Sequence, residues 1–541
     1  MRSEMRSVPK RLHVHPPRGK GRLAVVIPAG DEARTIQAVL RSVARLRPHT
    51  AVVVVNGSTD GTARLARRAG ARVLVYPRRL GNDVGRAVGA LAADADMYLF
   101  VDADFAVPTP VLRRLVAAVE AGADVALNSL GWLAQARRPD IPTLDRYVLN
   151  LFLRQRALGL ENLLTVPHVL SRRAVEAIGA STLANPLLAT AVALDRHLRV
   201  AVPTKFNVLA INRRRPNHIR RKGQAMAPAT QRIHGDAVEA VRYLLDQYGR
   251  RGGYALGGEG RQVFAAYRNP SWPERGDGPP QVSVVFSARQ ADGGLWARVR
   301  GLAAAGAEVV LVAQGSDLLG DGGNPPPQVR VVHVPAEAGS DVALAVGATY
   351  ARGEAVVFCD AAVPATAEEL WRFAHPVMNG EADGVVHDQR PFCGPLARMH
   401  PVHSAGWFAN VTMGRREWFG STWLVPPYAV RREALQALGP EVLQSPCLAQ
   451  MRALDQGWRL RLGPHLPAVR PDEESSAFML DRVLGHVLEG LWYWTERYGR
   501  RGGFTDEGRR RDVLPPVPGV YRIDRADGEP PRDVDLGWLC P

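Results

Sequence analysis

Residues 97–105 read MYLFVDADF, an apolar run of strand type that ends directly in Asp102 and Asp104. Two carboxylates one residue apart repel each other, so their placement is costly unless a cation lies between them. Mg2+ and Mn2+ take oxygen ligands of this kind and can bind a diphosphate at the same time. The stretch predicts a strand followed by a metal-binding loop with Asp102 and Asp104 as ligands; for such a pair standing alone, a solvated turn is the alternative.

Around this stretch, short Val/Ile-rich runs alternate with longer amphipathic segments. This alternation is typical of a mostly parallel sheet that is covered by helices on its faces. The expected strands are 23–28, 51–56, 71–76, 97–102 and 124–129, and the expected helices are 32–46, 61–69, 84–93 and 109–121.

The second half of the chain repeats the first. LGNDVGRAVGA at 80–90 matches AGSDVALAVGA at 338–348, and both halves close on the hexamer YGRRGG, at 248–253 and 498–503. Matches that keep their order along the chain indicate an internal duplication. The predicted fold class is α/β, with two Rossmann-like, mostly parallel sheet domains in tandem, each followed by a helical tail.

The expected domain organisation follows from the repeat and from the Pro/Gly-rich segment between its copies. We expect a basic N-terminal tail (1–21), a first domain (22–220), a helical extension (221–268), a linker (269–281), a second domain (282–470), a second helical extension (471–515) and a C-terminal tail (516–541).

The composition is that of a folded protein with a basic surface. The chain has 541 residues, of which 46% are hydrophobic and 23% charged, with a net charge of +16. The cations are scattered, which favours a solvated surface over nucleic-acid binding. The four cysteines lack metal or disulfide spacing, and no signal peptide or membrane span is visible. We expect a cytoplasmic protein and leave peripheral membrane contact open.

Further polar groups lie where the predicted strands end, which is where open α/β sheets bind ligands. A helix begins after each of these segments, so its free N–H groups can receive a phosphate, or the polar side chains can cap it. The candidate ligand-binding residues in these segments are Pro28, Asp31, Glu32, Asn56, Ser58, Asp60, Gly81, Arg86, Asp102 and Asp104.

Taken in order, these segments resemble the family 2 glycosyltransferases of the GT-A fold over roughly residues 23–130. The resemblance implies that Pro28, Asp31 and Glu32 border a nucleotide. It also implies that Asp60 and Arg86 lie near the base or diphosphate, and that Asp102 and Asp104 form the donor and metal site. At the start of the second motif the family carries a carboxylate, whereas this chain has Val55 and Asn56.

These groups suit transfer of a sugar from a nucleotide-diphosphate donor to a glycan, a lipid-linked acceptor or a phosphorylated small molecule. The leaving diphosphate gathers negative charge, which Arg86 and Mg2+ or Mn2+ would stabilise. An inverting enzyme also needs a base. Where the family has an acidic pair this chain reads Ala184-Asn185-Pro186-Leu187, so His168 is the candidate base beside catalytic Asp104, with Asp195 as a second option.

The second half lacks most of these charged groups. It therefore cannot hold a metal with a diphosphate in the same way, and we expect a pseudo-enzyme domain that shapes the acceptor site or binds glycan. The replacements are Gln290 for Asp31, Ala291 for Glu32, Leu344 for Arg86 and Ala362 for Asp104, with Asp360 standing alone.

Two features of this half and of the tails have alternative interpretations. The aromatic residues between 407 and 423 are dense enough for a sugar platform, although burial in a core is the plainer reading. Arg250, Arg251, Arg500 and Arg501 suit anionic lipid or a phosphorylated acceptor, or simply the helix dipole. The alternative function for the whole chain is a non-catalytic scaffold or regulatory subunit that binds nucleotide sugar or glycan.

Overall fold

The computed structural model describes residues 21–211, 216–254, 258–267, 278–290, 293–315, 325–466, 476–506 and 508–520. Nearly all of the expected N-terminal tail, most of the expected linker and the chain beyond residue 520 lie outside this part. Ala291, the expected counterpart of Glu32, lies outside it as well.

The first half contains a mixed sheet in which, over the described residues, seven strands run in the order β3-β2-β1-β4-β6-β5-β7. All neighbouring pairs are parallel except that β6 runs antiparallel to β4 and β5. The five strands expected from the sequence are confirmed. The strands are β1 (Leu23–Ala29), β2 (Thr50–Asn56), β3 (Arg72–Tyr76), β4 (Met97–Phe100), β5 (Val125–Asn128), β6 (His168–Ser171) and β7 (Val200–Thr204).

Helices cover the faces of this sheet and continue beyond it. The four expected helices are present with shorter bounds. The helices of this half are α1 (Ile36–Ala44), α2 (Thr62–Arg68), α3 (Val84–Leu91), α4 (Thr109–Glu120), α5 (Ile141–Phe152), α6 (Arg172–Ile178), α7 (Pro186–Asp195) and α8 (Pro228–Tyr248).

The second sheet has the same strand order, β10-β9-β8-β11-β13-β12-β14, and again one strand, β13, runs antiparallel to its neighbours. The expected α/β class with two similar domains is therefore confirmed, while their origin by duplication stays a prediction. The strands are β8 (Val282–Ala288), β9 (Glu308–Gln314), β10 (Val329–Val334), β11 (Ala355–Asp360), β12 (Gly384–Val386), β13 (Tyr428–Arg431) and β14 (Leu460–Leu462).

The helices of the second half follow the same plan, with one exception to the expected boundaries. Helix α9 was expected in the extension of the first domain, but it packs on the second one, where Phe264 joins the core beside α11. The helices are α9 (Gly258–Ala266), α10 (Gly293–Ala304), α11 (Ser340–Tyr350), α12 (Ala367–Met378), α13 (Pro401–Thr412), α14 (Arg432–Leu438), α15 (Pro446–Asp455) and α16 (Ser476–Tyr498).

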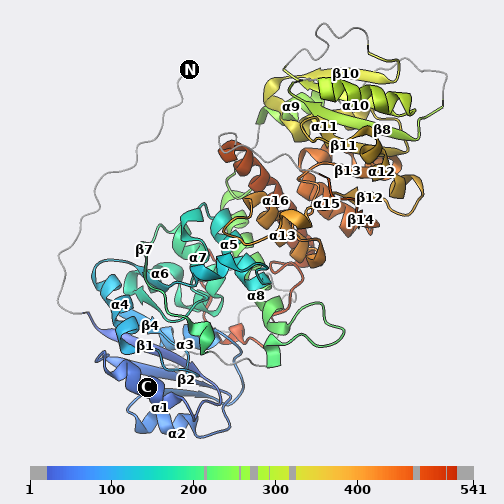
Figure 1. The fold of residues 1–541 in the computed structure, drawn as a ribbon. Coiled ribbons are helices and arrows are strands. Elements are labelled where there is room, and N and C mark those ends of the chain that lie inside the picture. The colour runs from blue at the N-terminus through green and yellow to red at the C-terminus, as the bar shows by residue number, and fades with distance from the viewer. Residues whose placement is uncertain are drawn as a thin grey trace, which may run out of the picture.

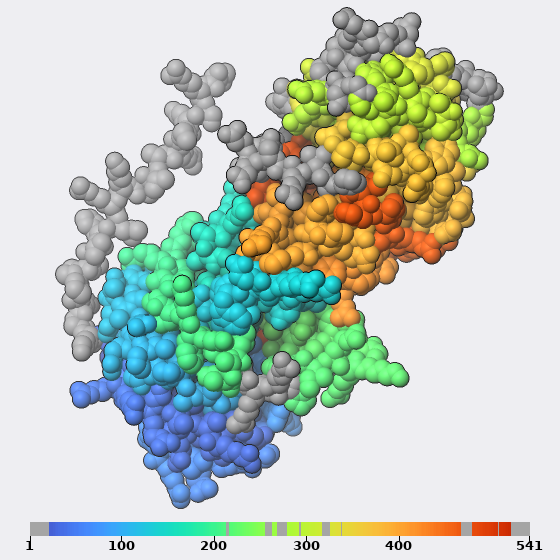
Figure 2. All heavy atoms as spheres, in the orientation of Figure 1, coloured from blue at the N-terminus to red at the C-terminus, as the bar shows by residue number. Residues whose placement is uncertain are grey.

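The two sheets lie at opposite ends of the molecule, with α5, α8, α13 and α16 between them (Figure 1). These helices share one apolar core, in which the rings of Phe152 and Phe408 meet at 5.9 Å. The space-filling view shows first-half and second-half segments in direct contact across this region (Figure 2). The halves are therefore joined by a continuous core rather than by the connecting chain alone.

Two pairs of arginine and glutamate cross this junction in a reciprocal way. Arg251, from the first YGRRGG hexamer, binds Glu489 of α16 at 3.0 Å, and Arg501, from the second hexamer, binds Glu239 of α8 at 2.9 Å. Arg500 binds Asp246 of α8 at 2.7 Å. These arginines hold the halves together, so they do not offer the lipid or acceptor contact considered from the sequence.

The aromatic residues between 407 and 423 are part of the core. Trp407, Phe408, Trp418 and Trp423 are buried, and Phe419 packs against the shared core between the halves. The plainer reading of the sequence is therefore correct, and these side chains form no sugar platform on the surface.

A glycine fixes how α3 packs on the sheet. A Cβ atom at Gly89 would overlap Cγ1 of Val26 in β1, and the counterpart Gly347 meets Cγ1 of Val285 in the same way. Helix and strand backbones thus approach more closely than any other residue allows. Because α3 begins at the donor-site segment, this contact also sets the depth of that segment in the fold.

We expect Gly89→Ala to destabilise the protein by about 1–3 kcal/mol, the usual cost of overpacking, which outweighs the roughly 1 kcal/mol that alanine gains in helix propensity. Urea unfolding of the variant measures this change. In the double variant with Val26→Ala the added methyl has room, so its loss of stability should be smaller than the sum of the two single losses. Additive losses would show that the Gly89–Val26 contact is not the cause.

Candidate active site

A cavity of about 520 Å³ opens at the carboxyl ends of β1, β2 and β4. This is the edge of the sheet where the sequence placed the donor site. The predicted residues that line the cavity are Pro28, Asp31, Glu32, Asn56, Gly81, Arg86, Asp102 and Asp104.

The two acids that follow β4 sit side by side in this lining. Strand β4 ends at Phe100, so Asp102 and Asp104 belong to the loop beyond it. The side chain of Asp102 is 31% exposed, whereas Asp104 is 7% exposed. Among the described residues there is no group of three or more acid, histidine or cysteine ligands. Two carboxylates fit Mg2+ or Mn2+ that completes its shell with water and substrate phosphate.

Arg86 lies between two acids at the start of α3. Its Nη2 is 3.5 Å from Oδ1 of Asp102, and its Nη1 is 3.2 Å from Oδ1 of Asp83. The guanidinium is only 9% exposed, so the surrounding protein screens these charges weakly. Arg86 is thus held at the edge of the acid pair, where a diphosphate bound to a metal would place its negative charge.

Asp31 and Glu32 line the other side of the cavity, after β1. Asp31 accepts a hydrogen bond from the backbone N–H of Thr59 at 2.7 Å, and this bond lowers the pKa of the carboxyl group. Arg79 lies 3.3 Å from the same side chain. Glu32 is buried and accepts from the Thr35 hydroxyl at 3.2 Å. Both acids are anchored by neighbouring loops.

Asn56, where the family pattern has a carboxylate, closes the turn that carries Gly81. Its amide donates to the carbonyl of Gly81 at 2.8 Å, and its Oδ1 accepts from the N–H of Leu80. The side chain therefore joins the end of β2 to the segment that leads into α3.

Ser58 and Asp60 are not among the lining residues, which differs from the expectation that they bind the donor. Ser58 donates to Asp60 at 2.9 Å, and Asp60 accepts from the N–H groups of Ala33 and Thr62. Burial alone would raise the pKa of Asp60, but these hydrogen bonds outweigh it and lower the pKa to about 2. The pair stabilises the start of α2 and fastens it to the loop after β1.

His168 is placed in the core, which argues against the predicted role as base. It is 1% exposed, stacks on Phe100 with ring centroids 5.0 Å apart, and its Nδ1 lies 2.8 Å from the carbonyl oxygen of Thr165. Burial, reinforced by the charge of Arg86, lowers the pKa of His168 to about 3. The ring is neutral near pH 7 and does not line the cavity.

Asp195 is also occupied elsewhere. It accepts hydrogen bonds from the hydroxyl groups of Tyr243, at 2.6 Å, and Tyr248, both on α8. Asp455 makes the same pair of contacts with Tyr493 and Tyr498 in the second half. Because the arrangement recurs where no equivalent set of donor-site charges exists, it serves packing of the helices.

Several lining residues were not singled out from the sequence. Arg232 comes from α8, and burial lowers the pKa of its guanidinium, opposed by the charge of Asp83. His218 ends a short 3-10 turn, Pro216–His218, and Gly508 lies more than four hundred residues beyond Gly81. No local pattern marks these positions, because only the tertiary fold brings them to the cavity. Arg79, Leu164 and Asn217 were not singled out either, whereas the remaining lining residues belong to the segments that the sequence marked at the strand ends: Ala29, Gly30, Asn82, Asp83 and Ala103.

In the second half, both carboxylate oxygens of Asp360 accept hydrogen bonds from neighbouring protein groups. Oδ2 of Asp360 accepts from the hydroxyl of Ser340 at 2.9 Å, and Oδ1 accepts from the N–H of Ala362 at 2.9 Å. Leu344, which replaces Arg86, is buried in the core. Asp360 is thus a loop-stabilising residue, as expected from the loss of its partners.

The first domain is of the α/β class, and it carries acids and an arginine at the carboxyl ends of its parallel strands, where domains of this class bind ligands. Within that class, residues 24–174 match the family model described as glycosyl transferase family 2. The amino-terminal domain belongs to this family. The resemblance seen in the sequence is therefore confirmed for this part of the chain.

Curated relatives of the chain include glycosyltransferases. An uncharacterised glycosyltransferase of Mycobacterium tuberculosis is 35% identical over 136 residues, which is 25% of this chain and 60% of the relative. The succinoglycan biosynthesis protein ExoA of Rhizobium meliloti is 38% identical over 121 residues, 20% of this chain and 37% of the relative. The chain thus spans about 60% of the length of the first of these relatives.

Solved structures were also compared. Glucosyl-3-phosphoglycerate synthase from Mycobacterium tuberculosis, in complex with Mn2+, uridine-diphosphate-glucose and phosphoglyceric acid, is 20% identical, with a TM-score of 0.32 over 41% of this chain and 79% of that chain.

We expect His168→Asn to keep the pH profile of sugar-donor turnover, because the ring does not reach the cavity. Stability should respond instead. Since folding lowers the pKa of His168 to about 3, its neutral form stabilises the fold fully above about pH 6.5 and less as the pH falls towards 3. Wild-type protein should lose up to about 1.4 kcal/mol per pH unit more than the variant in this window.

Unfolding by urea at pH 7, 6 and 5 measures this difference. A variant whose stability falls as steeply as that of the wild type, or whose turnover loses a pH limb, would contradict the assignment of His168 to the core.

Proposed function

We propose that the amino-terminal domain transfers a glycosyl group from a nucleotide-diphosphate sugar to an acceptor hydroxyl. The observation that carries this proposal is the placement of Arg86 against Asp102 and beside Asp104 in the cavity of a family 2 domain. The relatives named above support sugar transfer as the class of reaction.

Asp102 and Asp104 are the residues that would hold Mg2+ or Mn2+, and the ion would neutralise the diphosphate as it leaves. Arg86 adds a fixed positive charge at the same place. Because Asp83 and Asp102 hold the guanidinium in position before the reaction, it needs little reorganisation when charge develops on the leaving group. Asp31, Glu32 and Asn56 then form the nucleotide side of the cavity, next to Pro28 and Gly81.

The remaining cavity residues are proposed to face the acceptor. His218, which ends the turn Pro216–His218, and Arg232 of α8 supply polar groups that suit a glycan, a lipid-linked acceptor or a phosphorylated small molecule. An inverting outcome and a role in making cell-envelope polysaccharide follow from the family resemblance and belong to the proposal. No helix in the described part of the chain is both long and apolar enough to cross a bilayer.

The second domain is proposed to be non-catalytic and to support the first. One observation favours a different role for the whole chain, that of a scaffold or regulatory subunit that binds nucleotide sugar. The segment Ala184–Leu187 carries no acid, and Asn185 caps α7 and donates to Glu239 at 3.0 Å instead. Turnover with a panel of nucleotide sugars separates the two roles.

We expect Asp104→Asn to lower metal-dependent release of nucleoside diphosphate by about 100-fold or more, because the lost carboxylate weakens the hold on the ion that stabilises the leaving group. The control is Asp360→Asn, which changes the last residue of β11 and the one acid that the second half keeps, at the position of Asp102; this variant should leave turnover unchanged.

The assay follows nucleoside diphosphate release at varied Mn2+ concentration. Equal losses in the two variants would contradict the proposed division between the domains. Binding of a nucleotide sugar without release by the wild-type protein would favour the scaffold.

A further inference from the structure

The end of the chain returns to the first domain after α16. The sequence placed residues 471–515 in an extension of the second domain, but the segment after α16 crosses to α3 and α8 of the first. Gly508 lines the cavity, and the N–H of Arg510 donates to the carbonyl of Leu80 at 2.8 Å. A Cβ atom at Gly81 would overlap the carbonyl of Gly508, so the glycine at position 81 allows the two backbone segments to lie this close.

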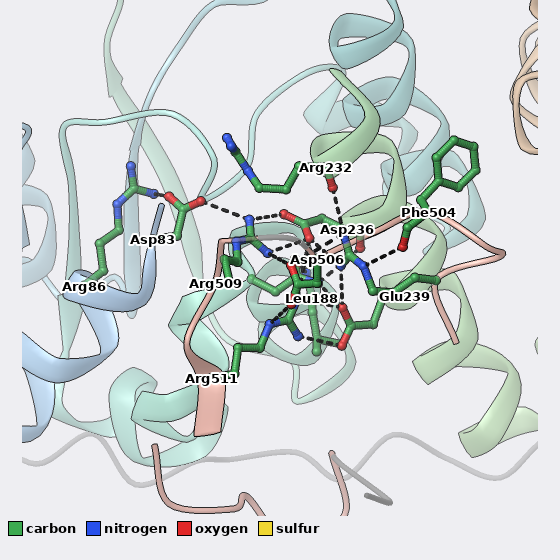
Figure 3. Close-up of polar contacts among 12 residues, drawn as sticks. Asp83, Arg86, Leu188, Arg232, Asp236, Glu239, Phe504, Asp506, Arg509 and Arg511 are labelled. Carbon is green, nitrogen blue, oxygen red and sulfur yellow. Dashed lines mark hydrogen bonds and ion pairs between the residues drawn. The ribbon is translucent and has the colours of Figure 1, made fainter. Parts of the chain in front are cut away.

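Arg509 is the central side chain of this contact. It is 1% exposed and binds Asp236 of α8 with both Nη atoms, at 2.7 Å and 2.6 Å. The same Nη2 lies 3.1 Å from Oδ2 of Asp83, whose Oδ1 is 3.2 Å from Arg86. Figure 3 shows Arg86, Asp83, Arg509 and Asp236 in this order, with Arg511 on Glu239 behind them.

The alternating charges along this row explain how Arg509 influences the position of Arg86 without contacting it. Asp83 is shared between Arg509 and Arg86, and Arg86 is shared between Asp83 and Asp102. If Arg509 were removed, Asp83 would keep Arg86, at 3.2 Å, as its ion-pair partner, with the charge of Arg232 also acting on it. The attraction between Asp83 and Arg86, at low exposure, would then draw Arg86 away from Asp102.

The second half provides an internal comparison. Asp341 stands at the position of Asp83 and is bound from a tail helix, by the guanidinium of Arg482 and the imidazole of His486 of α16. Three residues further along α11 the second half has the buried Leu344 where the first half has Arg86. The ion pair of Asp341 therefore does not continue to another arginine. In the first half alone the pair continues to a guanidinium that lines a cavity.

We infer that Gly508 and Arg509 are part of the donor site of the first domain and that Arg509 is a positioning residue, which acts through Asp83 to hold Arg86 against Asp102. The inference rests on the proposed function for its effect on donor binding. It means that the site is complete only in the full tandem chain, although residues 24–174 carry the family match.

The test compares Arg509→Met with Arg510→Met in the full chain. Arg510 is the matched control, because its side chain is exposed and, within the described part of the chain, forms its ion pair with the neighbouring Asp512 at 2.8 Å. We expect calorimetry with a nucleotide-diphosphate sugar and Mn2+ to show at least tenfold weaker donor binding for Arg509→Met. Arg510→Met should stay within twofold of wild type, and Arg509→Lys should recover part of the loss.

A second variant separates positioning from general loss of structure. In an Arg86→Gln background, Arg509→Met should weaken donor binding less than twofold further, because its effect passes through Arg86. A full tenfold loss in that background, or unchanged binding in the single variant, would overturn the inference.

Hydrogen–deuterium exchange gives a readout that needs no donor. Amides of residues 80–91 should exchange at least tenfold faster in Arg509→Met than in Arg510→Met, because the segment loses its anchor. If the wild type binds no nucleotide sugar, the proposed function fails, whereas exchange still decides the anchoring role: equal rates in the two variants would reject it.

Discussion

Asp236 is fully buried in α8, and a carboxylate in that position is stable only when cations surround it. Arg509 and Arg501 supply this charge from the far end of the chain, and together with the hydrogen bonds they make they outweigh burial, so that the pKa of Asp236 falls to about 2. The same arginine reaches Asp83, and Asp83 reaches Arg86. The position of Arg86 at the cavity therefore depends on a charge balance that begins in the helices between the two domains.

The sequence predicted the parts of this arrangement that depend on local pattern. Buried runs such as those of β1 and β4 identify strands because apolar residues continue on both faces of a covered parallel sheet. Asp102, Asp104 and Arg86 were found because they directly follow strands or begin a helix. His168 was misread because its position after a proline says nothing of its burial, and Arg232 and Gly508 were missed because only tertiary packing brings them to the cavity.

A comparison of the two halves distinguishes residues that the fold needs from residues that only the proposed reaction needs. Gly89 and Gly347 each contact a valine at the corresponding place in the sheet of their own half. Asp83 and Asp341 each bind an arginine that lies outside the sheet. These positions are kept in both halves, since each maintains the packing of α3 or α11. Arg86 has no such packing role, and its replacement by Leu344 fills the core without disturbing the strand order. The strand order, which the two halves share, therefore does not indicate which half carries the proposed activity.

The reciprocal arginines join the two halves of the chain through buried ion pairs. Glu239 and Glu489 are both buried, and each receives an arginine from the hexamer of the other half. Separating the halves would remove these partners from both carboxylates. It would also open the apolar core around Phe152 and Phe408. A domain cut at the limits of the family match would thus lose Arg501 and Arg509 together, and with them the charges that fix α3 at the cavity.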